Sequence, residues 1–293
     1  MVGDRGLRKA LVVGAFLAPS LVVLLAFWIG PMLGTIWISL QDWNLIGKAR
    51  YAGVDNYVEL ATDEKFHAAL GHTLLFIVAY LPLVLVLGLA VALLLDSALP
   101  AMPLFRAVFF LPVISSWVAV SLLWKWILNP AGGLLDRALS TVGIDGPGWW
   151  TDPNWAMPAV VLASVWKDLG FVAVLLLAGL QAIPTDLKEA AALDGANAWR
   201  RLRSVTLPLL SPSLFFVTVI SVINSFQVFD QVYVMTGGGP GDATTVVVQQ
   251  IVKYAFQYGR VGYASAMSIV LFAIVMLVTA LQVRLQKRWV HYD

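Results

Sequence analysis

Residues 181–212 read QAIPTDLKEAAALDGANAWRRLRSVTLPLLSP, a polar segment in a chain that is otherwise strongly apolar. Loops of roughly thirty residues are uncommon unless they have a function. The good helix formers from Leu187 to Leu193 predict a helix of about ten residues. Gly195 can take the left-handed conformation that ends such a helix, and a second short helix is expected at residues 197–205. The segment is therefore predicted to be a folded helical loop.

The composition on either side of this loop is that of a membrane protein. Of the 293 residues, 60% are hydrophobic and 12% are charged, and the mean hydropathy is +0.82. A soluble domain carries about 25% charged residues. Because a helix needs about 20 apolar residues to cross a bilayer, six blocks qualify: residues 11–33, 72–95, 106–127, 157–180, 209–235 and 264–283. The sequence predicts an all-α membrane protein with six transmembrane helices, forming a single transmembrane domain over residues 1–293.

The Lys and Arg residues of the loops predict the orientation, because basic loops favour the cytoplasmic side. Eleven lie at the termini, in residues 96–106 and in the polar loop: Arg5, Arg8, Lys9, Arg106, Lys188, Arg200, Arg201, Arg203, Arg284, Lys287 and Arg288. Seven lie in the alternate segments: Lys48, Arg50, Lys65, Lys125, Arg137, Lys253 and Arg260. Both termini and the polar loop are therefore expected in the cytoplasm. On the other side, residues 51–71 are expected to form a short amphipathic helix.

Several kinds of chemistry find no support in the sequence. Cysteine is absent, so neither disulfides nor thiolate catalysis is available. The three histidines form no cluster with metal-ligand spacing. The GGGPG segment at residues 237–241 lacks the Gly-Lys-Ser/Thr of a phosphate-binding loop. We therefore expect no catalytic residue, no metal and no cofactor in this chain, and the lipid bilayer rather than nucleic acid as its environment.

The fifth apolar block carries an unusual number of polar residues. Polar groups inside a span usually face a cavity or the interior of the bundle. Asn224, Gln227 and Gln231 are three and four residues apart, which would place them on one helix face. Amides both donate and accept hydrogen bonds, as sugar hydroxyls require. The alternative is hydrogen bonding between helices.

The fourth block adds a second group of polar residues. Lys167 is expected either to pair with Asp230, to bind an anionic group of a substrate, or to serve as a structural or snorkelling lysine. Neighbouring residues point to different sides of a helix, so Asp168 is expected to have another partner. The predicted substrate path comprises Ser164, Lys167, Asp168, Ser221, Asn224, Ser225 and Gln227.

The sequence EAAALDGA, followed by TLP, resembles the EAA loop of ABC-transporter permeases. The matching residues are Glu189, Ala190, Ala191, Asp194, Gly195 and Ala196. The segments YAGVDNY, FRAVFFLPVISSWVAVSLLWKWIL, GLQAIP, VMTGGGP and GYASAMSIVLF are similar to the carbohydrate-uptake branch, in the class of the first maltose permease and the sn-glycerol-3-phosphate permease. The resemblance spans nearly the whole chain.

This resemblance implies a permease subunit with the type I ABC importer architecture, in a bacterial or archaeal cell membrane. Residues 181–208 would form the coupling loop that docks into a cytoplasmic ATPase dimer, and that dimer would bind ATP and Mg²⁺. A second homologous permease would complete the path, and an extracellular binding protein would deliver a sugar or oligosaccharide. Two alternatives are import of a polyol phosphate such as glycerol 3-phosphate and an ion-coupled secondary transporter.

Overall fold

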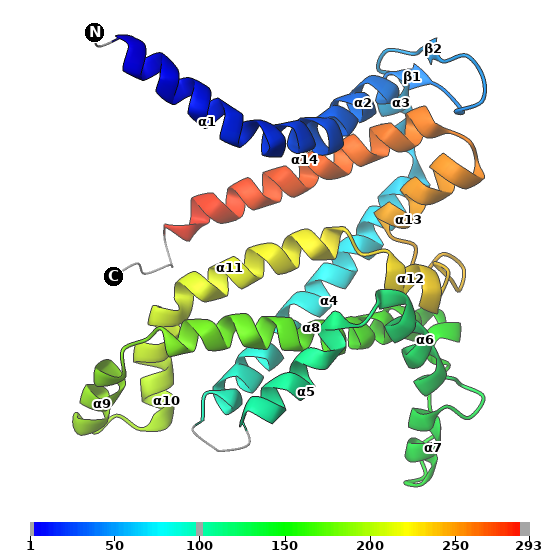
Figure 1. The fold of residues 1–293 in the computed structure, drawn as a ribbon. Coiled ribbons are helices and arrows are strands. Elements are labelled where there is room, and N and C mark those ends of the chain that lie inside the picture. Colours follow the sequence, from blue (N-terminus) through cyan, green and yellow to red (C-terminus); the bar gives the residue numbers. More distant parts are fainter. Residues whose placement is uncertain (1–2, 98–101, 288–293) are drawn as a thin grey trace. The chain divides into compact units, whose positions relative to one another are not determined.

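The computed structural model describes residues 3–97 and 102–287, and its elements are almost all helices (Figure 1). In these residues, five helices are long and apolar enough to cross a membrane: Val12–Ser39, Glu64–Leu95, Pro153–Gln181, Ala198–Phe226 and Val261–Gln286. A bent pair, Met102–Ile114 with Trp117–Ile127, makes a sixth if it counts as one span. The prediction of an all-α membrane protein is confirmed. Arg288 and the side chains of Arg5 and Arg8, which entered the orientation argument, lie outside the described part.

The chain divides into two compact units. The first comprises Met1–Asp63 and Ile251–Val270. It contains α1 (Gly3–Leu24), the π-turn η1 (Leu25–Ile29), α2 (Gly30–Ser39), β1 (Gln41–Asp42), β2 (Arg50–Tyr51), α3 (Asp55–Thr62), η4 (Lys253–Gln257) and the start of α14 (Val261–Gln286). α1, η1 and α2 follow one another without a break, and β1 pairs antiparallel with β2. The predicted helix at residues 51–71 is thus divided among β2, α3 and the first turns of α4.

An ion pair holds α3 against the start of α14 in this unit. The guanidinium of Arg260 donates to both carboxylate oxygens of Glu59, at 2.7 and 2.6 Å. These hydrogen bonds, with the charge of Arg260, lower the pKa of Glu59. Arg260 also lies 4.5 Å from the centre of the Tyr263 ring, and the hydroxyl of Tyr263 donates to Asp63 at 2.6 Å.

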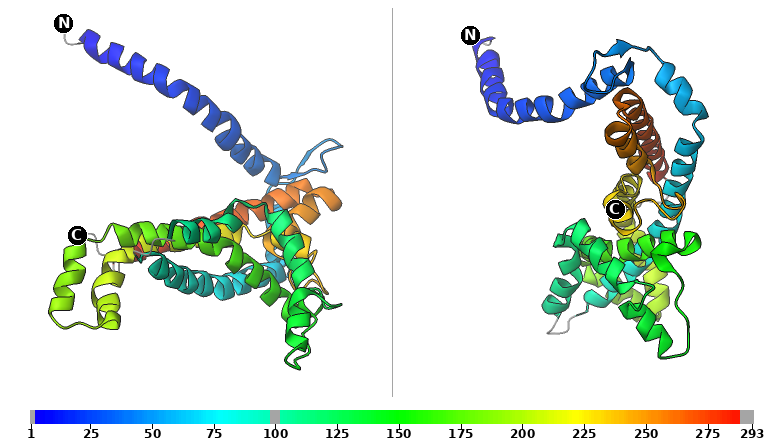
Figure 2. Two further views of the ribbon diagram at one scale, coloured as in Figure 1. Left: turned by 60° about the horizontal axis from the view of Figure 1, so that its bottom comes forward. Right: turned by 90° about the vertical axis from the view of Figure 1, so that its right-hand side faces the viewer.

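The second unit comprises Glu64–Gln250 and Leu271–Asp293. Its elements are α4 (Glu64–Leu95), α5 (Met102–Ile114), α6 (Trp117–Ile127), α7 (Leu134–Ser140), η2 (Trp149–Thr151), α8 (Pro153–Gln181), α9 (Thr185–Leu193), α10 (Ala198–Arg201), η3 (Leu202–Thr206), α11 (Leu207–Phe226) and α12 (Asp230–Met235), with most of α13 (Val247–Val252) and the rest of α14. Figure 2 shows further views of these elements.

α8 lies at the centre of the second unit, where it packs against α4, α5 and α11 (Figure 1). Glycines make these approaches close. A β-carbon on Gly170 would overlap the carbonyl oxygen of Phe109 in α5, and one on Gly179 would overlap Ser213 in α11. A β-carbon on Gly88 of α4 would overlap Val172 of α8. Small residues let helices approach closely in a membrane, where van der Waals packing drives association.

Two predicted spans are broken in the structure. The block at residues 106–127 bends by 100° between α5 and α6, and α5 contains Pro112 three residues before the break. The block at residues 209–235 ends as a helix at Phe226, and α12 starts a new helix at Asp230. The prediction that each block forms one continuous helix is wrong at these two places. Proline removes a backbone donor and favours a bend of this kind.

The polar loop is folded largely as predicted. α9 covers Thr185–Leu193, and Gly195 has a φ of +80°, so the predicted helix and its glycine end are confirmed. The second helix differs from the prediction, because α10 passes through η3 into α11 without a break. The side chain of Asn197 starts α10 by accepting a hydrogen bond from the Arg200 backbone N–H at 2.8 Å.

Candidate functional site

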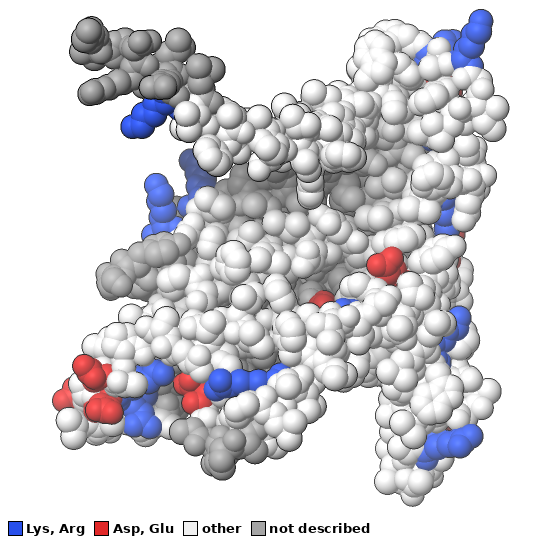
Figure 3. All heavy atoms as spheres, viewed as in Figure 1, with Lys and Arg blue, Asp and Glu red and all other residues white. Residues whose placement is uncertain are grey.

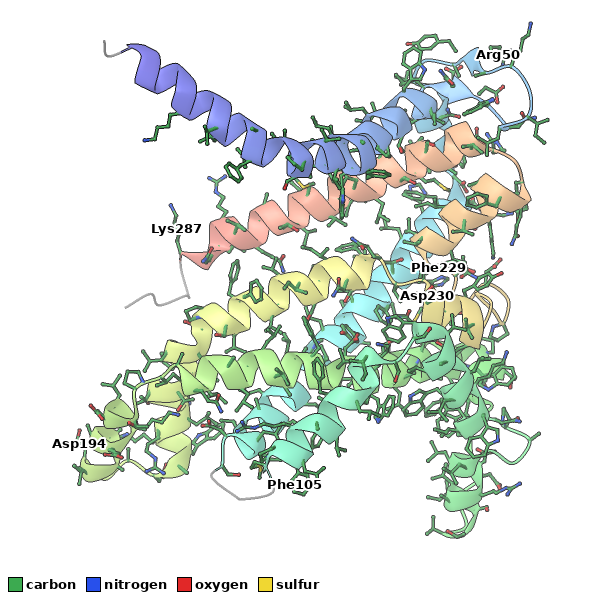
Figure 4. The ribbon with its side chains drawn as sticks, in the orientation of Figure 1. Arg50, Phe105, Asp194, Phe229, Asp230 and Lys287 are labelled. Atoms are coloured by element: carbon green, nitrogen blue, oxygen red, sulfur yellow. The ribbon has the colours of Figure 1, made fainter. Side chains whose placement is uncertain are left out.

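A polar pocket of about 270 Å³ lies in the second unit, where α4, α6 and α8 meet the connection between α11 and α12. The lining residues are Phe76, Tyr80, Trp117, Asp168, Asn224, Ser225, Gln227, Val228, Phe229, Asp230 and Gln231. Figure 4 labels Phe229 and Asp230, which follow the break after α11. The pocket combines carboxylates, amides and aromatic rings, which can accept from and donate to the hydroxyls of a ligand and cover its apolar faces.

A hydrogen bond between α4 and α8 forms one wall of this pocket. The hydroxyl of Tyr80 donates to Asp168 Oδ2 at 2.8 Å. The Tyr80 ring stacks on Phe76, with 5.2 Å between ring centres, and is only 4% exposed. Its position is therefore fixed by packing and by the carboxylate together. Asp168 Oδ1 receives no hydrogen bond from the described residues and remains available to a ligand.

The break between α11 and α12 forms another wall. The backbone N–H of Gln227 bonds to the carbonyl of Asn224, which closes the last turn of α11. The exposed side chains of Asn224, Gln227 and Asp230 then line the pocket from both sides of the break. Gln231 lies on the new helix, where its Nε2 donates to Ser164 Oγ at 3.3 Å.

Lys167 lies beside the pocket without lining it. Its ammonium donates to the carbonyl of Val113 at 3.2 Å and lies 4.7 Å from the centre of the Trp117 ring. The residue is 5% exposed. Val113 belongs to the last turn of α5, whose carbonyls have no partner further along that helix. Lys167 therefore caps the broken helix, and in the described part of the chain it makes no ion pair with Asp230.

The loop between α8 and α11 presents a second candidate surface. Every residue of α9 is at least partly exposed, and Leu193 is 89% exposed. Lys188 ties this helix to its neighbours, with its ammonium 3.5 Å from Asp96 Oδ2 and 3.4 Å from the carbonyl of Leu180. Figure 3 shows charged side chains grouped over α9 and α10, and Figure 4 labels Asp194 at the end of α9.

A groove of about 510 Å³ lies between α9 and α10, lined by Leu93, Lys188, Glu189, Ala192, Ala198, Arg201, Leu202 and Thr206. Glu189 thus lines this groove together with small, apolar and basic residues. The bend at Gly195 folds the two helices toward each other, because the Ala196 N–H bonds back to the carbonyl of Ala191 at 3.0 Å. An exposed helix beside a groove of this kind suits contact with another protein.

Comparison with known proteins assigns this architecture to a family. Residues 69–291 match the family described as binding-protein-dependent transport system inner membrane component. The chain belongs to this family of permeases.

Similar permeases come from bacteria and archaea. The trehalose/maltose transport system permease protein MalF of Thermococcus litoralis is 38% identical over 273 residues, which are 93% of this chain and 92% of that protein. The multiple sugar-binding transport system permease protein MsmF of Streptococcus mutans is 34% identical, over 94% of each chain. The permease is therefore a transport subunit of an ABC importer rather than an enzyme, and it is a multi-pass membrane protein.

The fold is also that of a solved importer. In the crystal structure of a bacterial ABC transporter involved in the import of the acidic polysaccharide alginate, one chain matches this permease with a TM-score of 0.84. The match covers 97% of this chain and 98% of that one, at 24% identity. A second structure shows the alginate transporter in complex with an alginate pentasaccharide-bound periplasmic protein, with a TM-score of 0.86 over 97% of this chain and 96% of that one, also at 24% identity.

The permease brings together only part of the predicted substrate path. Asp168, Asn224, Ser225 and Gln227 line the pocket, whereas Ser164, Lys167 and Ser221 are buried outside its lining. The predicted coupling residues, from Glu189 to Ala196, all lie on α9 and the turn that follows it. The aromatic residues Phe76, Tyr80 and Trp117 also line the pocket and were not predicted. A tyrosine hydroxyl inside an apolar span was the one signal available for Tyr80.

Proposed function

We propose that this permease and a second homologous permease together form the path for a sugar or oligosaccharide. This proposal rests on the composition of the polar pocket. Asp168 and the exposed amides of Asn224 and Gln227 line it together with the aromatic rings of Trp117 and Tyr80. Carboxylates accept hydrogen bonds from sugar hydroxyls, and amides both donate to them and accept from them. Aromatic rings pack against the apolar C–H faces of a sugar. The names of the similar trehalose/maltose and multiple-sugar permeases support this class of cargo.

We further propose a type I importer arrangement with both termini and residues 181–208 in the cytoplasm, and one permease domain over residues 1–293. The excess of basic residues in those segments supports this orientation. An extracellular binding protein delivers the sugar. An ATPase dimer, which binds ATP and Mg²⁺, receives α9 through Glu189, Ala190, Ala191, Asp194, Gly195 and Ala196. The exposure of α9 and the groove beside it support this docking.

The docking role is tested with the complete importer in liposomes. Glu189→Lys and Gly195→Asp are expected to abolish ATP-driven trehalose uptake and stimulated ATP hydrolysis, while membrane insertion is unchanged. Asp145→Lys, a charge reversal at an exposed loop residue between α7 and η2, serves as the matched control. Normal uptake by both loop variants contradicts the docking role.

Cysteine labelling tests the membrane orientation, and two uptake assays test the alternative functions, import of a polyol phosphate and ion-coupled transport. Because the chain has no cysteine, Leu193→Cys is expected to react with an impermeant maleimide only from the cytoplasmic side, and Ile46→Cys only from outside. Glycerol 3-phosphate replaces trehalose to test a polyol phosphate cargo. Collapse of the ion gradients is expected to leave ATP-driven uptake intact, and loss of uptake indicates an ion-coupled transporter.

A further inference from the structure

The charges that line the pocket are all of one sign. Asp168 and Asp230 supply two carboxylates, and none of the described lining residues is a lysine, an arginine or a histidine. An anion that enters such a pocket loses its water without meeting a cation among the described lining residues, which is costly. A neutral hydroxyl meets the opposite situation, because it donates to a carboxylate in a charge-assisted hydrogen bond.

Lys167 is the cation beside the pocket, and its ammonium is engaged by the end of α5 and by the Trp117 ring. The ammonium of Lys167 is occupied by the Val113 carbonyl at 3.2 Å and by the Trp117 ring at 4.7 Å. The residue is 5% exposed and does not line the cavity. A lysine that received phosphate or carboxylate groups would need to present its ammonium to the ligand. Lys167 instead holds the α5 end and the Trp117 ring that borders the pocket.

We propose that this pocket selects neutral, polyhydroxylated ligands and excludes anionic sugars such as sugar phosphates and uronic acids. The proposal rests on the proposed function and narrows it to uncharged saccharides. It separates this permease from the structurally similar importer of alginate, which is an acidic polysaccharide. In this arrangement Asp168 Oδ1 and Asp230 accept from ligand hydroxyls, while the amides of Asn224 and Gln227 supply donors and acceptors.

The absence of cysteine makes the pocket's charge measurable without knowing the natural cargo. Gln227→Cys places one thiol in the pocket, and Ile46→Cys places one in an exposed loop as the reference. In the full importer complex, each thiol reacts with a cationic trimethylammonium-ethyl or an anionic sulfonato-ethyl methanethiosulfonate. The parent complex supplies the background. We expect the cation-to-anion rate ratio at residue 227 to exceed that at residue 46 at least tenfold.

Removing either carboxylate is expected to reduce this preference. Asp168→Asn keeps an oxygen that accepts from Tyr80, and Asp230→Asn changes an exposed side chain, so each removes charge with little change in shape. In the Gln227→Cys chain, each is expected to lower the rate ratio at least threefold, whereas Asp145→Asn leaves it unchanged. A ratio at residue 227 equal to or below that at residue 46 overturns the proposal.

An uptake assay distinguishes failure of the charge selection from failure of sugar import. Trehalose and trehalose 6-phosphate share a skeleton and differ in charge, so their ATP-driven uptake is compared at equal concentration. Uptake of trehalose at least tenfold faster than that of the phosphate is expected. Equal or faster uptake of the phosphate overturns the charge selection while leaving sugar import intact. Uptake of neither contradicts trehalose as the cargo, and the thiol rate ratio then decides whether the pocket repels anions.

Discussion

Gly170→Ala is the substitution for which the structure gives the most direct estimate. Gly170 lies where α8 crosses α5, and an added β-carbon would overlap the Phe109 carbonyl oxygen and lie 2.8 Å from its carbon. Real β-carbon contacts almost never fall below 3.0 Å. A backbone carbonyl cannot rotate away as a side chain can, so the two helices must separate by roughly 1 Å, enough to lose a quarter to a half of the dispersion energy at the contact.

Overpacking of this kind costs about 1–3 kcal/mol. Replacing glycine by alanine inside a helix returns up to about 1 kcal/mol. The net loss lowers the melting midpoint by about 2–4 °C per kcal/mol in a chain of this size, measured on the purified permease in detergent. Gly71→Ala in α4 is the matched control, because an added β-carbon there meets nothing within 4 Å. A Gly170→Ala midpoint equal to or above that of Gly71→Ala refutes the estimate of the α5–α8 contact, because both variants share the gain from replacing glycine.

Three further predictions concern single contacts. Lys188→Asp and Asp96→Lys are each expected to lower ATP-driven uptake several-fold, and the double exchange to restore it, because the ion pair ties α9 to α4. The pair of Glu59 with Arg260 holds the pKa of Glu59 below 4.5. Its stabilisation, about 0.2–1 kcal/mol for a half-exposed pair, is therefore present above pH 4.5 and lost as the pH falls through the lowered pKa. The difference in melting midpoint between the parent and Glu59→Gln is expected to shrink as the pH falls from 4.5 and to vanish below the lowered pKa of Glu59. Tyr80→Phe removes the hydroxyl that joins α4 to α8. It is expected to slow ATP-driven uptake while changing the melting midpoint little.

The spans and the loop were predictable because they follow from local patterns. Hydropathy over about 20 residues identifies a membrane helix, and the alanine-rich run ending at Gly195 identifies α9. The breaks at Ser115 and after Phe226 were not predicted, and the first of them is stabilised by a contact with another helix. The capping of Val113 by Lys167 is such a contact, and no spacing within the sequence indicates it.

The same distinction explains the site. Asn224 and Gln227 were found because polar residues are rare in spans, and that rarity holds whether or not the helix continues. Gln231 was grouped with them by helical periodicity, but α11 ends before it and its amide bonds to Ser164 instead. Trp117 is ordinary in an apolar helix. Its ring lines the pocket from the first residue of α6, directly after the 100° bend, and the hydropathy pattern does not indicate that bend.

The two helices that carry the Tyr80–Asp168 hydrogen bond both end at the loop. α4 ends beside Asp96 and α8 ends beside Leu180, and the ammonium of Lys188 contacts both. At 1.5 Å per residue, the pocket lies roughly 20 Å along each helix from that contact. A displacement of α9 therefore acts on two rigid helices at once. If both move together, the 2.8 Å bond survives and the pocket moves as a body; if they move apart, the bond breaks and Asp168 is released toward the ligand. Slower uptake by Tyr80→Phe therefore indicates that the cycle keeps this bond, and unchanged or faster uptake indicates that the cycle breaks it.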